Sequence, residues 1–348
     1  MPAGSLAAGR RGPGRATVVC WGVLSPVLAF RPARVVERLA ARSAACPLSS
    51  KELIAAAAEL RLTLPLVRAP TPGVARAALV AAKQLHSVLG LSLPAGSPPE
   101  PWFKAVVQAA DEVAAGLPIF LAGEVRVGGR RDAEVEAAFR EAWNLADAGL
   151  THLTIDLAAV PAEARAEVLA RVAGPALEAG LGLDCVVARG GELEAGLLFG
   201  DLARAATLPD VASLPFDAPT TREAVQAQVR ELLALCAALS GTPVLRRGPV
   251  TPDLLRSLAG SPVAGCDDGG AAAEVALLAL DLAAGSGTAE SREAPLAQAE
   301  AALGAGALAR LEAMAYGEVL DFLERLGTTG SAQRIARHLE RSMVEPAP

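Results

Sequence analysis

The chain alternates between short apolar runs and amphipathic stretches eight times between Leu62 and Ala284. The apolar runs are hydrophobic on both faces, as parallel strands covered by helices must be. Several amphipathic stretches end in Ala-Gly-Leu, which is typical of a helix C-cap before the chain re-enters a sheet. Eight successive β-α units predict an α/β protein with a closed (β/α)8 TIM barrel. A doubly wound open sheet is the alternative, but the chain lacks its glycine-rich G-x-G-x-x-G turn.

The expected strands cover residues 62–67, 88–93, 118–127, 152–157, 183–188, 211–216, 243–246 and 263–267. The helices that follow them are expected at residues 73–86, 102–115, 132–148, 162–179, 192–206, 221–239, 252–258 and 271–284.

The barrel is expected to occupy residues 49–284, opening with an N-capped helix that starts at Ser49-Ser50-Lys51-Glu52. Residues 1–48 form an N-terminal extension, of which residues 1–15 are a Gly/Arg/Pro leader expected to be disordered. A polar linker at 285–293 precedes a C-terminal helical tail at 294–348.

Composition excludes several classes of partner. The net charge of −6 argues against a nucleic-acid surface. No apolar run reaches the roughly 18 residues of a membrane span, so no membrane association is expected. The five cysteines are scattered and form no C-x-x-C pair. That usage fits a reducing compartment, and we expect a cytoplasmic protein. The apolar run at 16–30 resembles a secretory signal, but Pro26 interrupts it and no small-x-small cleavage site follows.

Reactive groups of a TIM barrel lie at the carboxyl ends of its strands. The polar residues expected there are carboxylates and guanidinium groups: Arg68, Glu124, Arg126, Asp156, Asp184, Asp217, Arg246, Arg247, Asp267 and Asp268. The three histidines fall elsewhere. His86 ends a helix, His152 starts a strand, and His338 lies in the last helix. A zinc site built from two or three histidines at the catalytic face is therefore not expected.

Several segments, in order, resemble the class II ketose-bisphosphate aldolases, the zinc-dependent fructose and tagatose bisphosphate enzymes. The segment LPIFLAGEVRV stands where that family has a strand ending in His-Leu-Asp-His. The segment TPVLRRGPVTPDLLRSLAG resembles its strand ending in His-Gly-Gly-Ser-Gly, followed by a helix. The stretch from LTHLTIDLAAV to ARGGELE resembles the part that runs from Met-Ile-Asp to a Gly-Gly-Glu loop. The resemblance covers roughly residues 49–332.

The resemblance implies a site that has changed at most of its positions. Glu124 stands in the place of the catalytic aspartate, while Ala122 and Val125 replace the two flanking histidines. Arg246 or Arg247 replaces the third histidine ligand. Asp156 keeps the acid of Met-Ile-Asp, and Asp184 keeps the first acid of the next strand. Pro249 and Val250 interrupt the glycine-rich phosphate loop, so the family's run of backbone N–H phosphate donors is not expected here.

Three interpretations of this site remain open. The chain is a pseudoenzyme, because zinc without ligands cannot polarise a ketose carbonyl. Alternatively, Glu124, Asp156 and Asp184 gather Mg²⁺ or Mn²⁺ through oxygen. In the third interpretation no cofactor is used: Glu124 is a general base, and an arginine holds an anionic substrate.

We therefore expect Glu124, Asp156 and Asp184 to be catalytic and no resident metal. The substrate or anion is expected to contact Arg68, Arg246, Arg247, Asp267 and Asp268. The leading hypothesis is an aldolase-type carbon–carbon lyase by descent, acting on a small phosphorylated or anionic metabolite with zinc chemistry lost or replaced. The rival is a non-catalytic binding, scaffold or regulatory subunit. A homo-oligomer is expected in either case.

Overall fold

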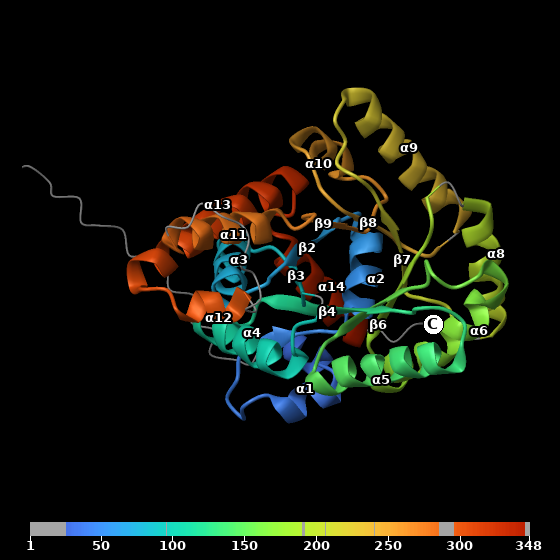
Figure 1. Cartoon of the computed structure of the whole chain (residues 1–348), viewed down its shortest axis with the longest axis horizontal. Helices are drawn as coiled ribbons and strands as arrows, with labels where there is room; N and C mark the ends of the chain where they lie inside the picture. Colours follow the sequence, from blue (N-terminus) through green and yellow to red (C-terminus); the bar gives the residue numbers. More distant parts are fainter. Residues whose placement is uncertain are drawn as a thin grey trace, which may run out of the picture.

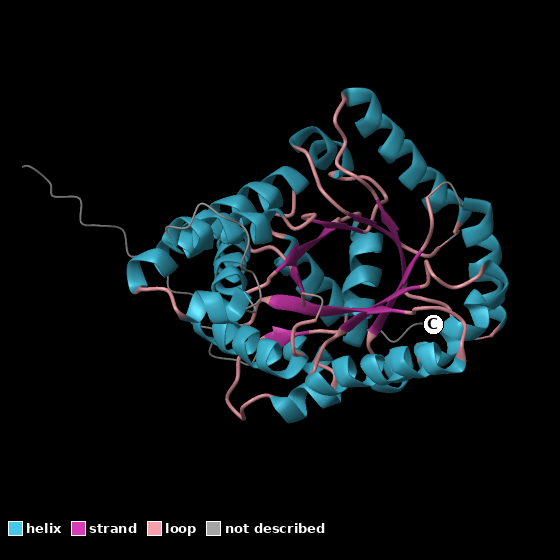
Figure 2. Cartoon of the chain, in the orientation of Figure 1, coloured by secondary structure: helices cyan, strands magenta, loops and turns pink. Residues whose placement is uncertain are grey.

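The structure is a computed structural model that describes residues 26–94, 96–189, 192–205, 207–239, 241–284 and 296–344. Eight parallel strands form a closed barrel, and helices surround it (Figures 1 and 2). Around the barrel, β2 to β9 follow one another in chain order, and β9 pairs with β2 to close the ring. The predicted TIM barrel is confirmed.

The eight barrel strands lie close to the expected ranges. They are β2 (Leu64–Arg68), β3 (Leu89–Ser92), β4 (Pro118–Arg126), β5 (His152–Asp156), β6 (Gly182–Val186), β7 (Val211–Pro215), β8 (Val244–Arg247) and β9 (Gly265–Asp267). The helices between them are α3 (Pro72–Leu85), α4 (Pro99–Val113), α5 (Asp132–Ala148), α6 (Arg165–Val172), α7 (Gly174–Ala179), α8 (Glu192–Arg204), α9 (Arg222–Ala238), α10 (Pro252–Leu258) and α11 (Ala271–Ala284).

The single helix predicted at 162–179 is wrong, because the structure divides this stretch. A short 3-10 turn, η2 (Ala162–Ala164), leads into α6, and α7 begins anew at Gly174. Pro175 follows at the first turn of α7. Proline lacks a backbone N–H and its ring clashes with the preceding turn, so a continuous helix through this position is disfavoured.

Local sequence signals begin and end these helices. Thr71 accepts a hydrogen bond from a backbone N–H in the first turn of α3, and Thr251 does the same for α10. The glycines of the Ala-Gly-Leu sequences, Gly116, Gly149 and Gly180, all have positive φ. A side chain at that backbone conformation is strained, so glycine ends α5 and α7 at little cost, and Gly116 forms the turn that follows α4.

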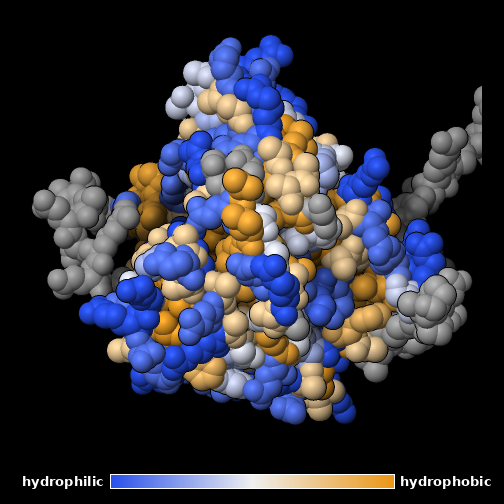
Figure 3. Space-filling view, turned by 90° about the vertical axis from the view of Figure 1, so that its right-hand side faces the viewer, coloured by the Kyte–Doolittle hydropathy of each residue, from blue (hydrophilic) through white to orange (hydrophobic). Residues whose placement is uncertain are grey.

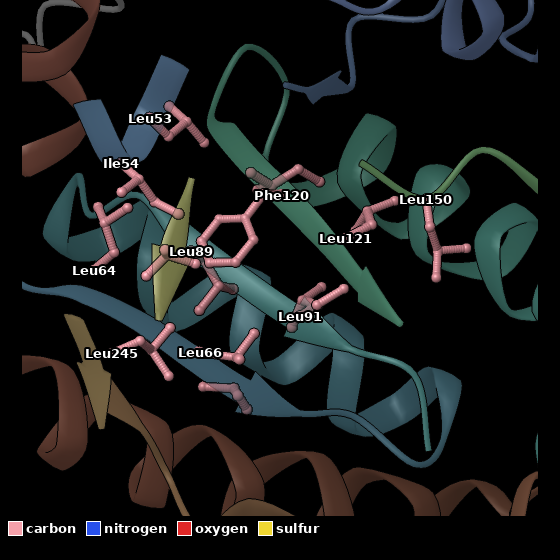
Figure 4. Packing of buried hydrophobic residues seen from close by; sticks show 14 of the residues in the cluster. Leu53, Ile54, Leu64, Leu66, Leu89, Leu91, Phe120, Leu121, Leu150 and Leu245 are labelled. Atoms are coloured by element: carbon pink, nitrogen blue, oxygen red, sulfur yellow. The ribbon is translucent and has the colours of Figure 1, made fainter. Parts of the chain in front are cut away.

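The alternation of the strands decides which side chains lie inside the barrel. On β4, a Cβ added at Gly123 would meet Leu145 and Leu150, so this residue faces the surrounding helices. Its neighbours on either side therefore face the interior. Phe120, two positions before Ala122, faces the interior by the same alternation (Figure 4), and its ring covers Gly90 of β3.

The segments outside the barrel pack against its amino-terminal end and flank. The short strand β1 (Cys46–Pro47) pairs with the start of β4, after η1 (Pro26–Phe30) and α1 (Ala33–Arg38). The opening helix α2 (Ser50–Leu60) contacts β6 and the last helix, α14 (Ser331–Val344).

The C-terminal tail is helical in the residues described: α12 (Leu296–Ala301), α13 (Ala305–Leu326) and α14. Helix α13 lies along α3 and α11 (Figure 1). The predicted leader at 1–15 and linker at 285–293 lie outside the described residues.

None of the helices in the described part of the chain is both long and apolar enough to cross a membrane. The face that carries α8 shows hydrophobic residues interspersed with hydrophilic ones (Figure 3). Leu193 of α8 is an exposed leucine.

Candidate functional site

A cavity of about 360 Å³ opens at the carboxyl ends of the strands. Five of the predicted site residues line it: Arg68, Glu124, Asp156, Arg247 and Asp267. Their strands lie around most of the barrel, and each residue is at or near the last position of its strand. The alternation of the strands turns these side chains inward, which explains why residues far apart in the sequence meet here.

Glu124 is held by two arginines. Its Oε1 accepts a hydrogen bond from Arg126 Nε at 2.7 Å, and its Oε2 accepts one from Arg247 Nη2 at 2.6 Å. Burial acts to raise the pKa of Glu124, but the charges and hydrogen bonds of Arg247 and Arg126 outweigh it and lower the pKa below the usual value. Glu124 is thus ionised at neutral pH and is a weak base.

Arg247 lies between two carboxylates. Besides its bond to Glu124, its Nε is 3.9 Å from Asp267 Oδ2. Burial acts to lower the pKa of Arg247, and the charges of Asp184, Glu124 and Asp267 raise it above the usual value. The guanidinium of Arg247 therefore stays charged and forms ion pairs with Glu124 of β4 and Asp267 of β9.

Asp156 ends β5 at the cavity edge. Its Oδ1 accepts a hydrogen bond from the N–H of Ala158 at 2.9 Å, and its Oδ2 is 4.0 Å from Arg126 Nε. The Asp156 carboxylate is half-buried, and its Oδ2 forms an ion pair with Arg126.

Asp184 does not line the cavity but lies deeper in the barrel, where it is 1% exposed. Its Oδ2 accepts hydrogen bonds from the hydroxyls of Thr154 at 3.0 Å and Ser213 at 2.9 Å. His152 Nε2 is 3.8 Å from the same oxygen, and its Nδ1 is 2.6 Å from Ser50 Oγ. A buried polar chain thus runs below the cavity floor toward the amino-terminal end of the barrel.

The structure separates the two candidate arginines of β8. Arg247 faces the cavity, and Arg246, one residue earlier, faces the helices and is 0% exposed. Arg246 donates hydrogen bonds to the carbonyls of Gly248 and Pro249, and its guanidinium lies over the Phe216 ring. Arg246 is therefore placed to hold the loop after β8 and has no contact with the cavity.

Asp267, the last residue of β9, and Asp268, which follows it, bind backbone N–H groups. Asp267 Oδ1 accepts hydrogen bonds from the N–H groups of Gly248 at 2.6 Å and Gly269 at 3.1 Å. Asp268 accepts hydrogen bonds from the N–H groups of Arg68, Gly270 and Ala272 at 3.0–3.2 Å. Asp268 is outside the cavity lining and caps the start of α11.

Burial is the main cause that raises the pKa of both Asp267 and Asp268. It raises the pKa of Asp267 above the usual value, although the charge of Arg247 acts in the opposite direction. Burial, followed by the charge of Asp267, raises the pKa of Asp268 to about 6.

Two guanidinium groups complete the cavity lining. Arg165, at the start of α6, donates a hydrogen bond to the Val160 carbonyl and pairs with Glu194. Sequence reasoning missed Arg165, since nothing in its local pattern distinguishes it from an exposed helix residue. Arg68 is exposed, and within the described ranges no carboxylate lies within ion-pair distance of its side chain.

The residues at the mouth do not fit the zinc site that the aldolase resemblance implies. Ala122 and Val125 are buried apolar residues, and arginines occupy the remaining ligand position. The parts of the chain that are described contain no group of three or more His, Cys, Asp or Glu side chains arranged to hold a metal. The structure does not bring Glu124, Asp156 and Asp184 together: Arg126 lies between the first two, and Asp184 lies below them.

Comparison with known proteins places the fold among aldolases. The chain matches no protein-family model and no curated protein sequence. Among solved structures it is similar to the YdjI aldolase from Escherichia coli K12, with a TM-score of 0.59, 10% identity and coverage of 82% of this chain and 99% of that one. It is also similar to a candidate fructose-1,6-bisphosphate aldolase from Coccidioides immitis, with a TM-score of 0.59, 12% identity and coverage of 81% and 96%. At this identity the similarity establishes the aldolase-like barrel fold.

Proposed function

We propose that the chain is an aldolase-like barrel that binds a small organic anion at its mouth without zinc-dependent aldol chemistry. The observation that carries this proposal is the set of four arginines around one cavity, of which Arg68 has no carboxylate partner in the described part of the chain. Guanidinium groups form strong, charge-assisted hydrogen bonds with anionic oxygens. The cavity volume of about 360 Å³ lies within the usual range for sites that take a small molecule.

The geometry favours binding over catalysis. A general base for carbon–carbon cleavage needs a pKa near the working pH. The ion pairs with Arg247 and Arg126 lower the pKa of Glu124 instead. Ala122 and Val125 supply no metal ligand, so the residues present provide no Lewis acid of the zinc type.

The proposal is tested by the thermal stability of the purified protein with and without a panel of small anions. A ligand that binds only the folded state raises the melting temperature, and the increase grows with the logarithm of the ligand concentration above the dissociation constant. We expect stabilisation in wild type and its loss in Arg68→Gln. Arg310→Gln, at an exposed position on α13 outside the cavity, is the matched control and should respond as wild type does. Equal responses of all three proteins, or no response to any anion, would refute the proposal.

An aldol-type carbon–carbon lyase is the second candidate, because both solved structures reported above carry aldolase names and share the barrel over about four-fifths of this chain. Metal analysis combined with an aldol-cleavage screen on ketose bisphosphates tests it. Stoichiometric zinc with cleavage activity would show that ligands outside those considered above support the zinc chemistry. Cleavage without metal that disappears in Glu124→Gln would show metal-free catalysis and displace the binding-only proposal.

A further inference from the structure

The loops after β8 and β9 carry several backbone N–H groups, and two of the residues that donate them, Gly248 and Gly269, line the cavity. TIM barrels frequently bind phosphate with the loops that follow their seventh and eighth strands, which β8 and β9 are here. In this chain the donors are already used. Gly248 and Gly269 donate to Asp267, and Gly270 and Ala272 donate to Asp268. The chain's own carboxylates thus take the hydrogen bonds that a phosphate needs.

The same two loops also leave no gap between them. A Cβ added at Gly269 would lie 2.2 Å from the Cα of Pro249, so the loops pack backbone against backbone. A Cβ added at Gly248 would lie 2.0 Å from the Phe216 carbonyl oxygen. A phosphate group is larger than the methyl group that fails to fit at either position. A phosphate therefore cannot enter between Gly269 and Pro249, or between Gly248 and Phe216 of the loop after β7, while these loops keep this conformation.

Of the arginines that line the cavity, Arg68 is the one without a carboxylate partner among the described residues. It ends β2, next to β9, and its side chain lies beside Gly270 at the cavity. Arg247 and Arg126 bind Glu124, and Arg165 binds Glu194. A free guanidinium fork matches the two oxygens of a carboxylate in a bidentate arrangement.

We infer that the anion bound at this mouth is a small, non-phosphorylated carboxylic acid whose carboxylate pairs with Arg68. This inference rests on the proposed anion-binding function and narrows it to a substrate class. The carboxylates of Asp267 and Asp268 exclude phosphate in two ways: they occupy the backbone donors, and they repel a dianion more strongly than a monoanion. Arg68 supplies one positive charge to one carboxylate.

Isothermal titration calorimetry at pH 7.5 with two ligands of the same carbon number, glycerate and glycerol 3-phosphate, tests the inference. We expect glycerate to bind wild type at least about tenfold more tightly than glycerol 3-phosphate. Arg68→Gln removes a charged hydrogen-bond donor and should weaken glycerate binding about tenfold or more. Arg68→Lys keeps the charge but loses the fork, so it should recover only part of the affinity. Arg310→Gln is the control and should bind as wild type does.

A second variant tests the reason for the preference. Asp267→Asn removes the negative charge beside Gly248 while keeping an oxygen that accepts its hydrogen bond. We expect the preference for glycerate over glycerol 3-phosphate to narrow at least about threefold in this variant. An unchanged preference would overturn the role assigned to Asp267.

The outcomes separate this inference from the proposed function. Tighter binding of glycerol 3-phosphate in wild type would overturn the carboxylate inference and leave anion binding intact. Binding of glycerate that does not depend on Arg68 would likewise overturn it. Failure of glycerate, glycerol 3-phosphate and the wider anion panel to bind at all would refute the proposed function and the inference together.

Discussion

Phe120 packs over Gly90 in the barrel interior. We therefore predict that Gly90→Ala destabilises the wild-type protein but does not destabilise a variant in which the Phe120 side chain is shortened. A Cβ built on Gly90 would lie 2.2, 2.6 and 2.7 Å from three atoms at the far end of the Phe120 ring. Ordinary contact begins at 3.4 Å, so the ring must move by about 1.2 Å. Phe120 is 1% exposed and surrounded by leucines and Ile54 (Figure 4), so it has little room to move.

We expect Gly90→Ala to destabilise the fold by about 2–3 kcal/mol, as overpacking of a dense core does. Gly90 has no positive φ, so alanine fits its backbone. Without the clash, alanine would stabilise by about 0.5–1 kcal/mol, because it reduces the entropy of the unfolded chain. Phe120→Leu removes the ring atoms that clash and by itself costs about 1 kcal/mol. In that background Gly90→Ala should be neutral or stabilising.

The assay is urea unfolding of the four proteins of this cycle, followed by circular dichroism. The expected coupling between the two sites is about 3 kcal/mol, well above the few tenths found for independent sites. Gly196→Ala on α8 is the control, since no atom lies within 4 Å of its added Cβ, and it should stabilise by up to about 1 kcal/mol. If the costs of the two substitutions simply add, Phe120 does not pack on Gly90 and the argument from these distances is wrong.

Three further predictions concern charge and backbone strain. Arg247→Met should raise the pKa of Glu124, because it removes the stronger of the two positive charges that lower this pKa. Titration of the Glu124 carboxyl by NMR in the variant and in wild type checks this, and an unchanged pKa would show that Arg247 does not stabilise the ionised Glu124. Burial raises the pKa of Asp268 to about 6 in the folded state, so its protonation adds stability as the pH falls from about 6 to 4, and this contribution is lost as the pH rises. Asp268→Asn should remove about 2 kcal/mol of the difference in unfolding free energy between pH 4.5 and pH 7, measured by urea unfolding. Equal dependence of the unfolding free energy on pH in the two proteins would contradict this prediction. His86 ends α3 at a φ of 50°, a backbone conformation that strains any residue with a side chain. His86→Gly should therefore stabilise the folded protein by up to about 1 kcal/mol, measured by thermal unfolding. A loss of stability would show that the contacts of the His86 side chain contribute more than the backbone strain costs.

Much of the barrel could be predicted from local patterns. The eight apolar runs, the threonines that begin helices and the Ala-Gly-Leu sequences that end them each act over a few residues. These signals need no knowledge of distant contacts, so sequence alone places them. The helix at 162–179 is the exception: the helical spacing of its sequence is continuous, but the structure interrupts it at Ala173, between α6 and α7.

The candidate site was only partly predictable. The positions of Glu124, Asp156 and Asp267 at strand ends followed from the barrel rule, and all three line the cavity. Whether Arg246 or Arg247 faces it depends on the alternation of β8. That strand is apolar on both faces before it ends, so its sequence contains no signal for which face is inward.

The sequence by itself determined the order of strands and helices and the absence of histidine from the strand ends at the mouth. Ala122, Val125 and the arginines of β8 stand in the sequence at the positions where the aldolase resemblance implies zinc ligands. Only the tertiary structure decided how the charges pair. Glu124 and Arg247 are separated by 123 positions in the chain and meet because ring closure and strand register bring them together. The same closure buries Asp184, gives the backbone donors of two loops to Asp267 and Asp268, and leaves Arg68 available at the cavity.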